Sequence, residues 1–195
     1  MIKNSGKFNG AGLKALEARI RAMGKKKVVV GVPAATNNLR EGELSNAMIA
    51  AVHEFGATIN HPGGTSYGYR TEKDARDGKS RFLRNGQGYM ETGKTGAHKI
   101  KIPERSFLRS TFNEQKENWS KLIIKGFHHQ LANNGDINSV LGSVGGVMMG
   151  DVQRKIESGI SPANAPSTVR KKKSSKTLMD SGALKSSITY EVRDK

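Results

Sequence analysis

The hydrophobic positions of the chain are most regular between residues 106 and 131. Large apolar side chains recur there at spacings of three, four and seven residues: Phe107, Leu108, Phe112, Trp119, Leu122, Ile123, Phe127 and Leu131. This spacing gathers them on one face of a helix, so we predict a core helix from Ser106 to Leu131. Pro103 disfavours helix at the residue before it, and Thr111 with Glu114 has the form of a capping box, which marks the helix start to within a turn.

Three further segments have helical periodicity. Apolar residues between positions 13 and 23 predict a short amphipathic helix that Gly24 ends. Those between positions 43 and 55 predict a second helix, with Phe55 in the core and Gly56 in a positive-φ turn. A third helix is predicted from Val140 to Ser158, in which four glycines lower the helix propensity but allow close packing on a neighbour: Gly142, Gly145, Gly146 and Gly150.

Two segments have the pattern of strands. The β-branched run within Lys27 to Val32 predicts a well-buried strand, and the alternating residues of Ser187 to Val192 predict a half-buried one. We therefore predict an α+β fold, in which a small, mostly antiparallel sheet packs against two long helices. A Pro-, Ser- and Lys-rich connection from Ser161 to Lys176 leads into the extended C-terminal segment.

The stretch from Pro62 to Lys101 interrupts these patterns. It holds eight glycines and nine basic against four acidic residues, without sustained periodicity. We expect a long basic loop or hairpin extension, a flexible insertion within a single domain that spans residues 1–195. Loops of this size are usually functional or disordered, and the sequence leaves both alternatives open.

Composition adds limits on chemistry and partners. A formal net charge of +16 in 195 residues attracts any polyanion, nucleic acid above all, without a specific site. The chain has no cysteine, which excludes disulfides and thiolate zinc sites. Neither a signal peptide nor an apolar run long enough to cross a bilayer is visible, so we expect a soluble protein made in the cytoplasm, with no membrane partner.

The pattern of a phosphate-binding loop occurs once, from Gly88 to Thr95, with Lys94 as its lysine. Such a loop needs a buried strand before it and a helix after it. A polar segment precedes this stretch and Pro103 cuts short any helix that follows, so the match is interpreted as a coincidence in a glycine-rich loop.

Other candidate sites also fail on spacing. His53-Glu54 lacks the second histidine of a zinc protease, since Ala57 occupies that position. His128 and His129 point in different directions on a helix and are interpreted as a partly exposed pair. Asp180-Ser-Gly182 is interpreted as a turn or helix start. We therefore predict no catalytic residue, no metal ligand and no cofactor site, and a protein that is not an enzyme.

A basic run lies in the connection before the last strand. It would suit contact with DNA phosphates or an acidic partner, and a solvated loop is the equal alternative. No recognition motif or aromatic stripe accompanies this charge, so sequence-specific readout has no support. The residues concerned are Arg170, Lys171, Lys172, Lys173 and Lys176.

Four motifs follow one another in a fixed order along the chain. They are Met48-Ile-Ala-Ala-Val-His-Glu-Phe-Gly56, Ile102-Pro-Glu-Arg-Ser-Phe-Leu-Arg109, Ser161-Pro-Ala-Asn-Ala-Pro-Ser-Thr-Val169 and Leu178-Met-Asp-Ser-Gly-Ala-Leu-Lys-Ser-Ser-Ile188. In this order they resemble the tail-completion, or neck, protein family of long-tailed bacteriophages. The resemblance extends from the strand at Val28 to Val192.

The resemblance implies a structural virion protein without enzymatic activity. It would complete the tail and join it to the head connector as one subunit of a homo-oligomeric ring. The implied partners are the connector and the tail tube or terminator proteins, with transient contact to genomic DNA. It would be found in the virion, and in the host cytoplasm during assembly.

Ring packing requires two different faces on each subunit, for which the long insertion and the C-terminal segment are candidates. Glu104, Arg105 and Arg109 flank the start of the central helix and form either intersubunit or only local ion pairs. The alternatives are a tail terminator or head-tail connector adaptor, and, from another class, a nonspecific nucleic-acid-binding protein.

Overall fold

The computed structural model describes residues 10–39, 44–84, 87–133 and 135–195. The chain divides into two compact units, Met1–Phe55 with Arg105–Lys195, and Gly56–Glu104. We call the first the helical unit and the second the inserted unit. Helices with small antiparallel sheets make the fold α+β, which confirms the predicted class.

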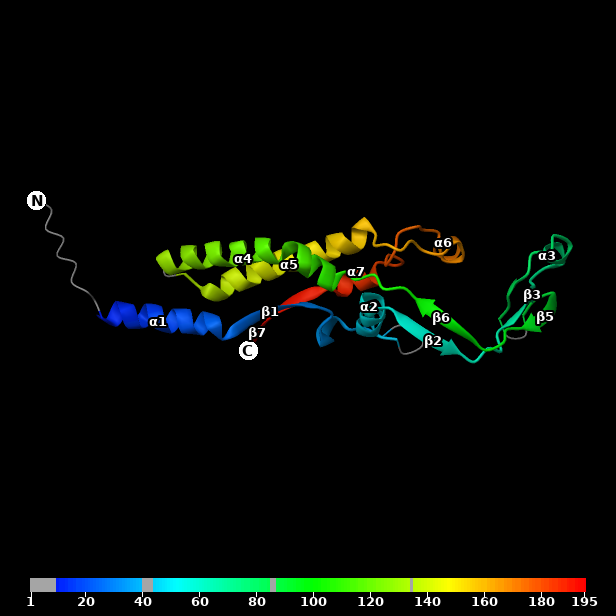
Figure 1. Cartoon of the computed structure of the whole chain (residues 1–195), viewed down its shortest axis with the longest axis horizontal. Coiled ribbons are helices and arrows are strands. Elements are labelled where there is room, and N and C mark those ends of the chain that lie inside the picture. The colour runs from blue at the N-terminus through cyan, green and yellow to red at the C-terminus, as the bar shows by residue number, and fades with distance from the viewer. Residues whose placement is uncertain (1–9, 40–43, 85–86, 134) are drawn as a thin grey trace, which may run out of the picture. The chain divides into compact units, whose positions relative to one another are not determined.

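Two long helices and a two-stranded sheet form the centre of the helical unit (Figure 1). Helix α4 (Leu108–Ala132) packs along α5 (Ile137–Ser158), and α5 also contacts β1 (Lys26–Gly31) and β7 (Thr189–Asp194). The two strands pair antiparallel, with Val28 opposite Val192. Both helices and both strands lie within a few residues of their predicted positions, because the helices have strong apolar periodicity and β1 is a β-branched run. The prediction that β1 is well buried is wrong: none of its residues is fully buried, and Val29 is 37% exposed, because β7 is its single partner strand among the described residues.

The core lies where α5 meets the strands and the start of α4. Its largest fully buried side chains are Phe107, Ile156, Ile188 and Val152. A second cluster surrounds Trp119, whose indole N–H donates to Asp151 Oδ2 at 2.7 Å. The predicted apolar face of α4 is only partly covered, because Phe112 and Leu122 are about half exposed.

One of the four α5 glycines permits the close packing that was predicted. A Cβ on Gly145 would lie 2.3 Å from the ring carbon Cδ2 of Tyr190 on β7. Gly142 and Gly150 have only ordinary neighbours, and a Cβ on Gly146 would meet nothing within 4 Å. The prediction is therefore confirmed for Gly145 alone.

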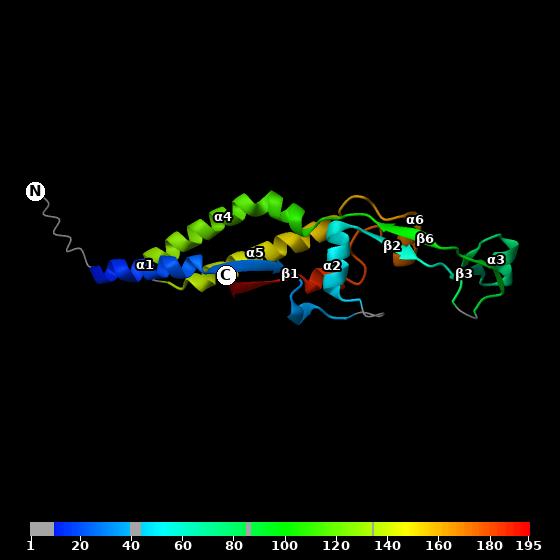
Figure 2. The ribbon, with the colours of Figure 1, turned by 60° about the horizontal axis from the view of Figure 1, so that its bottom comes forward.

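Shorter elements complete the helical unit. Helix α1 (Gly10–Gly24) precedes β1, a 3₁₀ turn (η1, Ala34–Thr36) follows it, and α2 (Asn46–Phe55) leads to the inserted unit. Helices α6 (Pro166–Lys172) and α7 (Ala183–Ser187) precede β7. Figures 1 and 2 both show α1 extending away from the N-terminal end of β1 rather than lying on the sheet.

The inserted unit is built from short strands. Strand β2 (Ala57–His61) pairs antiparallel with β6 (His98–Ile102). Beyond this ribbon, β3 (Ser66–Tyr69) lies between β4 (Arg81–Phe82) and β5 (Met90–Lys94), and α3 (Glu72–Arg76) connects β3 to β4. The sequence predicts either a basic loop or a hairpin extension for residues 62–101. The structure has the hairpin extension, with paired strands of its own.

Candidate functional site

Segments from all four sequence motifs meet in the helical unit at the start of α4. Ala50 from α2, Phe107, and Leu184 with Ile188 from the last motif share one buried cluster. The remaining motif reaches the same place through Pro162, whose carbonyl accepts a hydrogen bond from Arg105 at 2.8 Å. These motifs therefore build one junction, which we call the α4 junction.

The side chain of Glu54 is the centre of this junction. It lies at the end of α2, is buried, and caps the first turn of α4. Its Oε2 accepts from the N–H groups of Phe107 and Leu108 at 2.8 and 2.9 Å. Its Oε1 accepts from the Ser106 hydroxyl at 2.7 Å and the Arg109 N–H at 2.9 Å. A carboxylate here satisfies helix N–H groups that would otherwise be unpaired and interacts favourably with the helix dipole.

The pKa of Glu54 reflects two opposing effects. Burial by itself raises the pKa, because it disfavours the charged form. The hydrogen bonds from Leu108, Ser106, Arg109 and Phe107 outweigh burial, and the pKa lies below its ordinary value. Glu54 is therefore held as a carboxylate, an acceptor at all its contacts, and not as a proton donor.

Arg105 and Arg109 extend the junction in two directions. Arg109 Nε donates to Glu54 Oε1 at 3.1 Å, and its guanidinium carbon lies 4.6 Å from the centre of the Phe55 ring. Arg105 is buried, and it donates to the carbonyls of Pro162 and Ala163. Both arginines thus make local contacts, while Glu104 is exposed.

Two predictions at this junction are wrong. Thr111 does not cap α4: it lies inside the helix, and its hydroxyl donates to the Phe107 carbonyl at 2.6 Å. The cap comes instead from Glu54, a residue distant in sequence. Phe55 is not in the core but 64% exposed, because the turn of α2 that buries Glu54 directs its neighbour outward. Gly56 has φ +70°, as predicted.

The predicted basic run surrounds the end of α6. Arg170, Lys173 and Lys176 are exposed, and Lys172 Nζ donates to the Lys176 carbonyl at 3.2 Å. Lys171 belongs to the same helix, but its side chain is outside what the structure describes. None of the four described side chains forms an ion pair with an acid among the described residues. The run therefore presents positive charge without a direct ion pair to a described acid, although the pKa of the Glu157 carboxyl is lowered mainly by Lys185 and also by Lys176.

The dismissed motifs have structural roles. The stretch from Gly88 to Thr95 contains β5, not a loop that enters a helix, and so lacks the geometry of a phosphate-binding loop. Gly182 starts α7 with φ +82°, which confirms the interpretation of Asp180-Ser-Gly182 as a helix start. His128 and His129 are exposed on α4, as a surface pair would be. His53 is half-buried with its Nδ1 unpaired, and desolvation, with Arg105 and Lys172, lowers its pKa.

Within residues 10–39, 44–84, 87–133 and 135–195, no group of three or more His, Asp or Glu side chains is placed to hold a metal ion. No helix in the same ranges is long and apolar enough to span a membrane. Comparison of the chain with family models, with curated proteins and with solved structures gives no match.

Sequence reasoning missed the role of Glu54. The sequence carried one signal for this role. Phe107, at the α4 N-cap, has no side-chain oxygen to accept a helix N–H, and Glu54 is an acid at the end of a predicted helix.

Proposed function

We propose that this chain is a non-enzymatic structural protein of the phage neck, a ring subunit that completes the tail and joins it to the head connector. The four ordered motifs support the proposal, since they meet in one junction that sets the start of α4. The observation that carries it is a pair of different, uncovered apolar surfaces on the helical unit.

The first surface is a stripe on α1. Leu13, Leu16 and Ile20 follow helical spacing, and they are 52%, 38% and 50% exposed. Arg19, on a neighbouring face, anchors α1 by donating to the carbonyls of Gln130 and Gly135 at 2.9 Å. The stripe therefore has a fixed place but lacks a full covering from its own chain.

The second surface is an open groove of about 380 Å³. Side chains from β1, α4 and α5 line it, and the half-exposed ring of Phe112 forms part of its wall. Its apolar lining residues include Val28, Val30, Leu108, Phe112, Trp119 and Met148.

A closed ring needs heterologous contacts, in which one face of a subunit binds a different face of the next. The α1 stripe and this groove have matching apolar character and lie on separate elements, so the occupant of the groove is α1 of a second copy. The two-stranded sheet adds to this, because β1 and β7 pair only with each other among the described strands and each leaves one edge open.

The proposed partners are the neighbouring copies, the head-tail connector, and the tail tube or terminator proteins. Genomic DNA would pass through the ring, which suits the positive charge of Arg170, Lys172, Lys173 and Lys176. The proposed location is the neck of the virion, after assembly in the host cytoplasm. A terminator or connector adaptor would share the ring and differ in its layer.

Electron microscopy of particles made without this gene tests the proposal. We expect full heads that are not joined to tails, beside tails of normal length. Tails of uncontrolled length would instead assign the protein to the terminator layer. Normal infectious virions would overturn the structural role and leave nucleic-acid binding as the function.

A further inference from the structure

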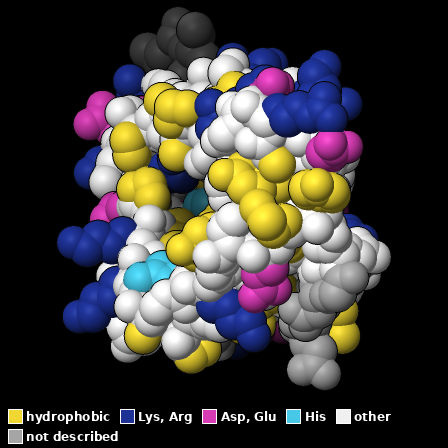
Figure 3. Space-filling view, turned by 90° about the vertical axis from the view of Figure 1, so that its right-hand side faces the viewer, with side chains coloured by type: hydrophobic (Ala, Val, Ile, Leu, Met, Phe, Trp, Pro, Cys, Tyr) yellow, Lys and Arg dark blue, Asp and Glu magenta, His cyan; other side chains and the backbone are white. Residues whose placement is uncertain are grey.

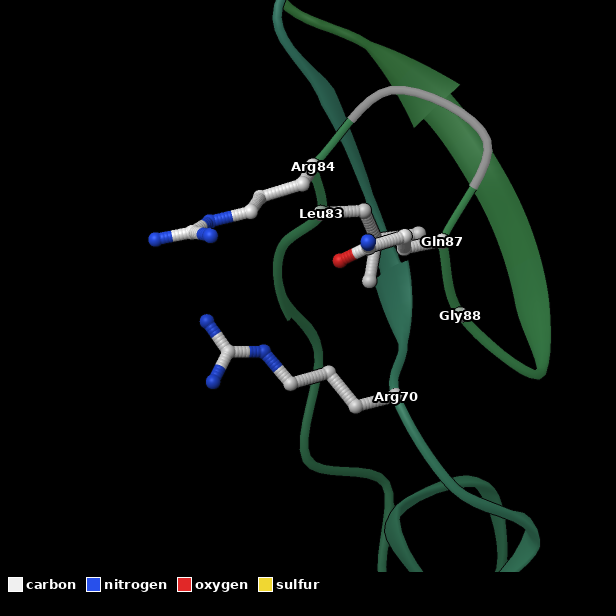
Figure 4. Close-up of a pocket in the computed structure, with 5 residues that line it drawn as sticks. All are labelled: Arg70, Leu83, Arg84, Gln87 and Gly88. Atoms are coloured by element: carbon white, nitrogen blue, oxygen red, sulfur yellow. The ribbon is translucent and has the colours of Figure 1, made fainter.

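The inserted unit contains a pocket of about 400 Å³ whose lining residues are Arg70, Leu83, Arg84, Gln87 and Gly88. Arg70 follows β3 directly, and Arg84 follows β4, the strand paired with β3. Figure 4 shows the two guanidinium groups on the same side of the pocket, with the Gln87 amide directed the same way. Strand pairing therefore brings together two arginines that are well separated in sequence.

The backbone around the pocket is fixed by hydrogen bonds. The Leu83 N–H donates to the Ser66 carbonyl, and the Gln87 N–H donates to the Arg84 carbonyl, both at 2.9 Å. The Leu83 side chain is buried and forms an apolar part of the wall. Gly88 has φ +135°, and a Cβ there would lie 3.0 Å from both Leu83 methyl carbons. Glycine therefore allows the backbone to approach this wall closely.

Neither Arg70 nor Arg84 forms an ion pair with an acid among the described residues of the unit. Three acids of the unit are already paired with other cations. Those pairs are Glu72 with Arg76, Asp77 with Lys79 and Asp74 with Arg81. Arg70 uses one Nη2 contact, to the Phe82 carbonyl at 3.3 Å, and retains its other donors. Two like charges at one pocket favour the binding of an anion.

We propose that this pocket binds a backbone phosphate of nucleic acid. Two planar guanidinium groups provide paired donors that match phosphate oxygens, and the Gln87 amide adds a neutral donor. The Leu83 side chain offers an apolar surface beside them, which suits the sugar next to a phosphate.

Further positive charge on the same unit favours a nucleic-acid backbone, with its row of phosphates, over a single small anion. Lys99 and Lys101 are two residues apart on β6, so they lie on one face of that strand. Neither they nor Lys73 and Lys94 pair with an acid among the described residues. Figure 3 shows one face of the whole molecule, with lysine and arginine side chains at its margin and a few acidic and several apolar side chains among them.

Fluorescence anisotropy of a labelled DNA oligonucleotide with the purified full-length chain, over a range of salt concentrations, tests this proposal. Replacing Arg70 and Arg84 together by Gln is expected to weaken binding about tenfold or more at low salt, because charge-assisted hydrogen bonds are lost. The slope of log affinity against log salt should also fall by about 1 for the lost phosphate contact. This readout does not depend on the proposed role in the neck.

Two control variants separate the pocket from general charge. Arg76→Gln with Arg81→Gln removes the same charge from the same unit, but at arginines already paired with acids, and should change the affinity less than twofold. Arg70→Lys with Arg84→Lys keeps the charge but removes the planar donors, and should still weaken binding severalfold. Far-ultraviolet circular dichroism checks that each variant is folded.

Equal losses for both pairs of Gln variants would overturn the proposal, since net charge alone would then explain binding. Full affinity in the Lys variant would also overturn it, because point charges would suffice. If the variant with Arg70→Gln and Arg84→Gln lost binding to a labelled oligoglutamate peptide but kept its affinity for DNA, the pocket would be assigned to an acidic protein partner instead.

Discussion

Arg109 binds Glu54 through three of its own groups. Its backbone N–H and Nε donate to Oε1 at 2.9 and 3.1 Å, and its Nη2 donates to the Glu54 carbonyl at 2.7 Å. The carboxylate thus caps α4 while the arginine ties the start of α4 back to the end of α2. A single residue pair couples two helices whose sequence positions are separated by the whole inserted unit.

Glu54→Gln is expected to lower the free energy of unfolding of the helical unit by about 3 kcal/mol, because the amide keeps one acceptor but directs an NH₂ group at helix donors. Fluorescence of Trp119, the one tryptophan of the chain, during urea unfolding measures this. Glu114→Gln is the matched control: Glu114 pairs with Lys155 at the surface, so its loss should cost less than about 1 kcal/mol. Equal effects of the two changes would contradict the capping role.

Stability of the helical unit is expected to fall on acidification in two steps. The pKa of His53 is lowered from its ordinary value of 6.5, so below pH 6.5 the unfolded state takes up a proton that the folded state resists. The pKa of Glu54 is lowered from its ordinary value of 4.5, so its contribution is complete above that pH and is lost as pH falls below it. Both steps lower the free energy of unfolding as the pH falls.

Urea midpoints of Trp119 fluorescence between pH 3 and 8 follow these steps. His53→Gln should remove the step below pH 6.5 and leave the lower one, while Glu54→Gln should do the reverse. A flat profile for the unmodified chain from pH 7 to 5 would contradict the assignment to His53.

Gly145→Ala and Gly146→Ala are expected to have opposite effects, although they are neighbours on α5. The added methyl at Gly145 meets the Tyr190 ring, so we expect a loss of about 1–3 kcal/mol from overpacking. The methyl at Gly146 enters open space, so improved helix propensity should add about 1 kcal/mol. Thermal unfolding of the two variants measures the difference, and destabilisation by both would show that Gly146 is also tightly packed.

Charge on the α1 stripe is expected to prevent self-association. Leu16→Glu with Ile20→Glu places carboxylates on the face that we propose binds a neighbouring copy, whereas Ala18→Glu with Ala22→Glu places them on the opposite face of the same helix. Light scattering coupled to size-exclusion chromatography should show smaller species for the first variant only. Identical elution of all three proteins would contradict the ring contact.

The sequence predicts the helical unit well because its elements are long and strongly periodic. Helices α4 and α5 have regular apolar spacing and β1 is a β-branched run, and both signals are visible in the chain itself, although the apolar face of α4 and strand β1 are only partly buried. The cap of α4 was not predictable in this way, because Glu54 reaches it from another helix. The error at Phe55 has the same origin, since burial of Glu54 fixes the rotation of the last turn of α2.

The structure of the inserted unit could not be predicted from the sequence in the same way. Its strands have two to five residues and include Gly68 and Gly93, so their periodicity is too short to detect. The pocket of Arg70 and Arg84 depends on which strands pair, and nothing local specifies that β3 lies between β4 and β5. The charge of the segment was visible, but the convergence of two of its arginines was not.

The backbone bond from the Arg105 N–H to the His53 carbonyl, at 2.7 Å, closes the helical unit at the point where the chain leaves it and returns. The contacts of the α4 junction lie on residues outside 56–104, so the junction does not depend on the inserted unit. A tight turn is able to replace that whole segment with little loop-closure entropy. The same frame is equally suited to carrying a different module, so residues 56–104 can vary without redesign of the helical unit.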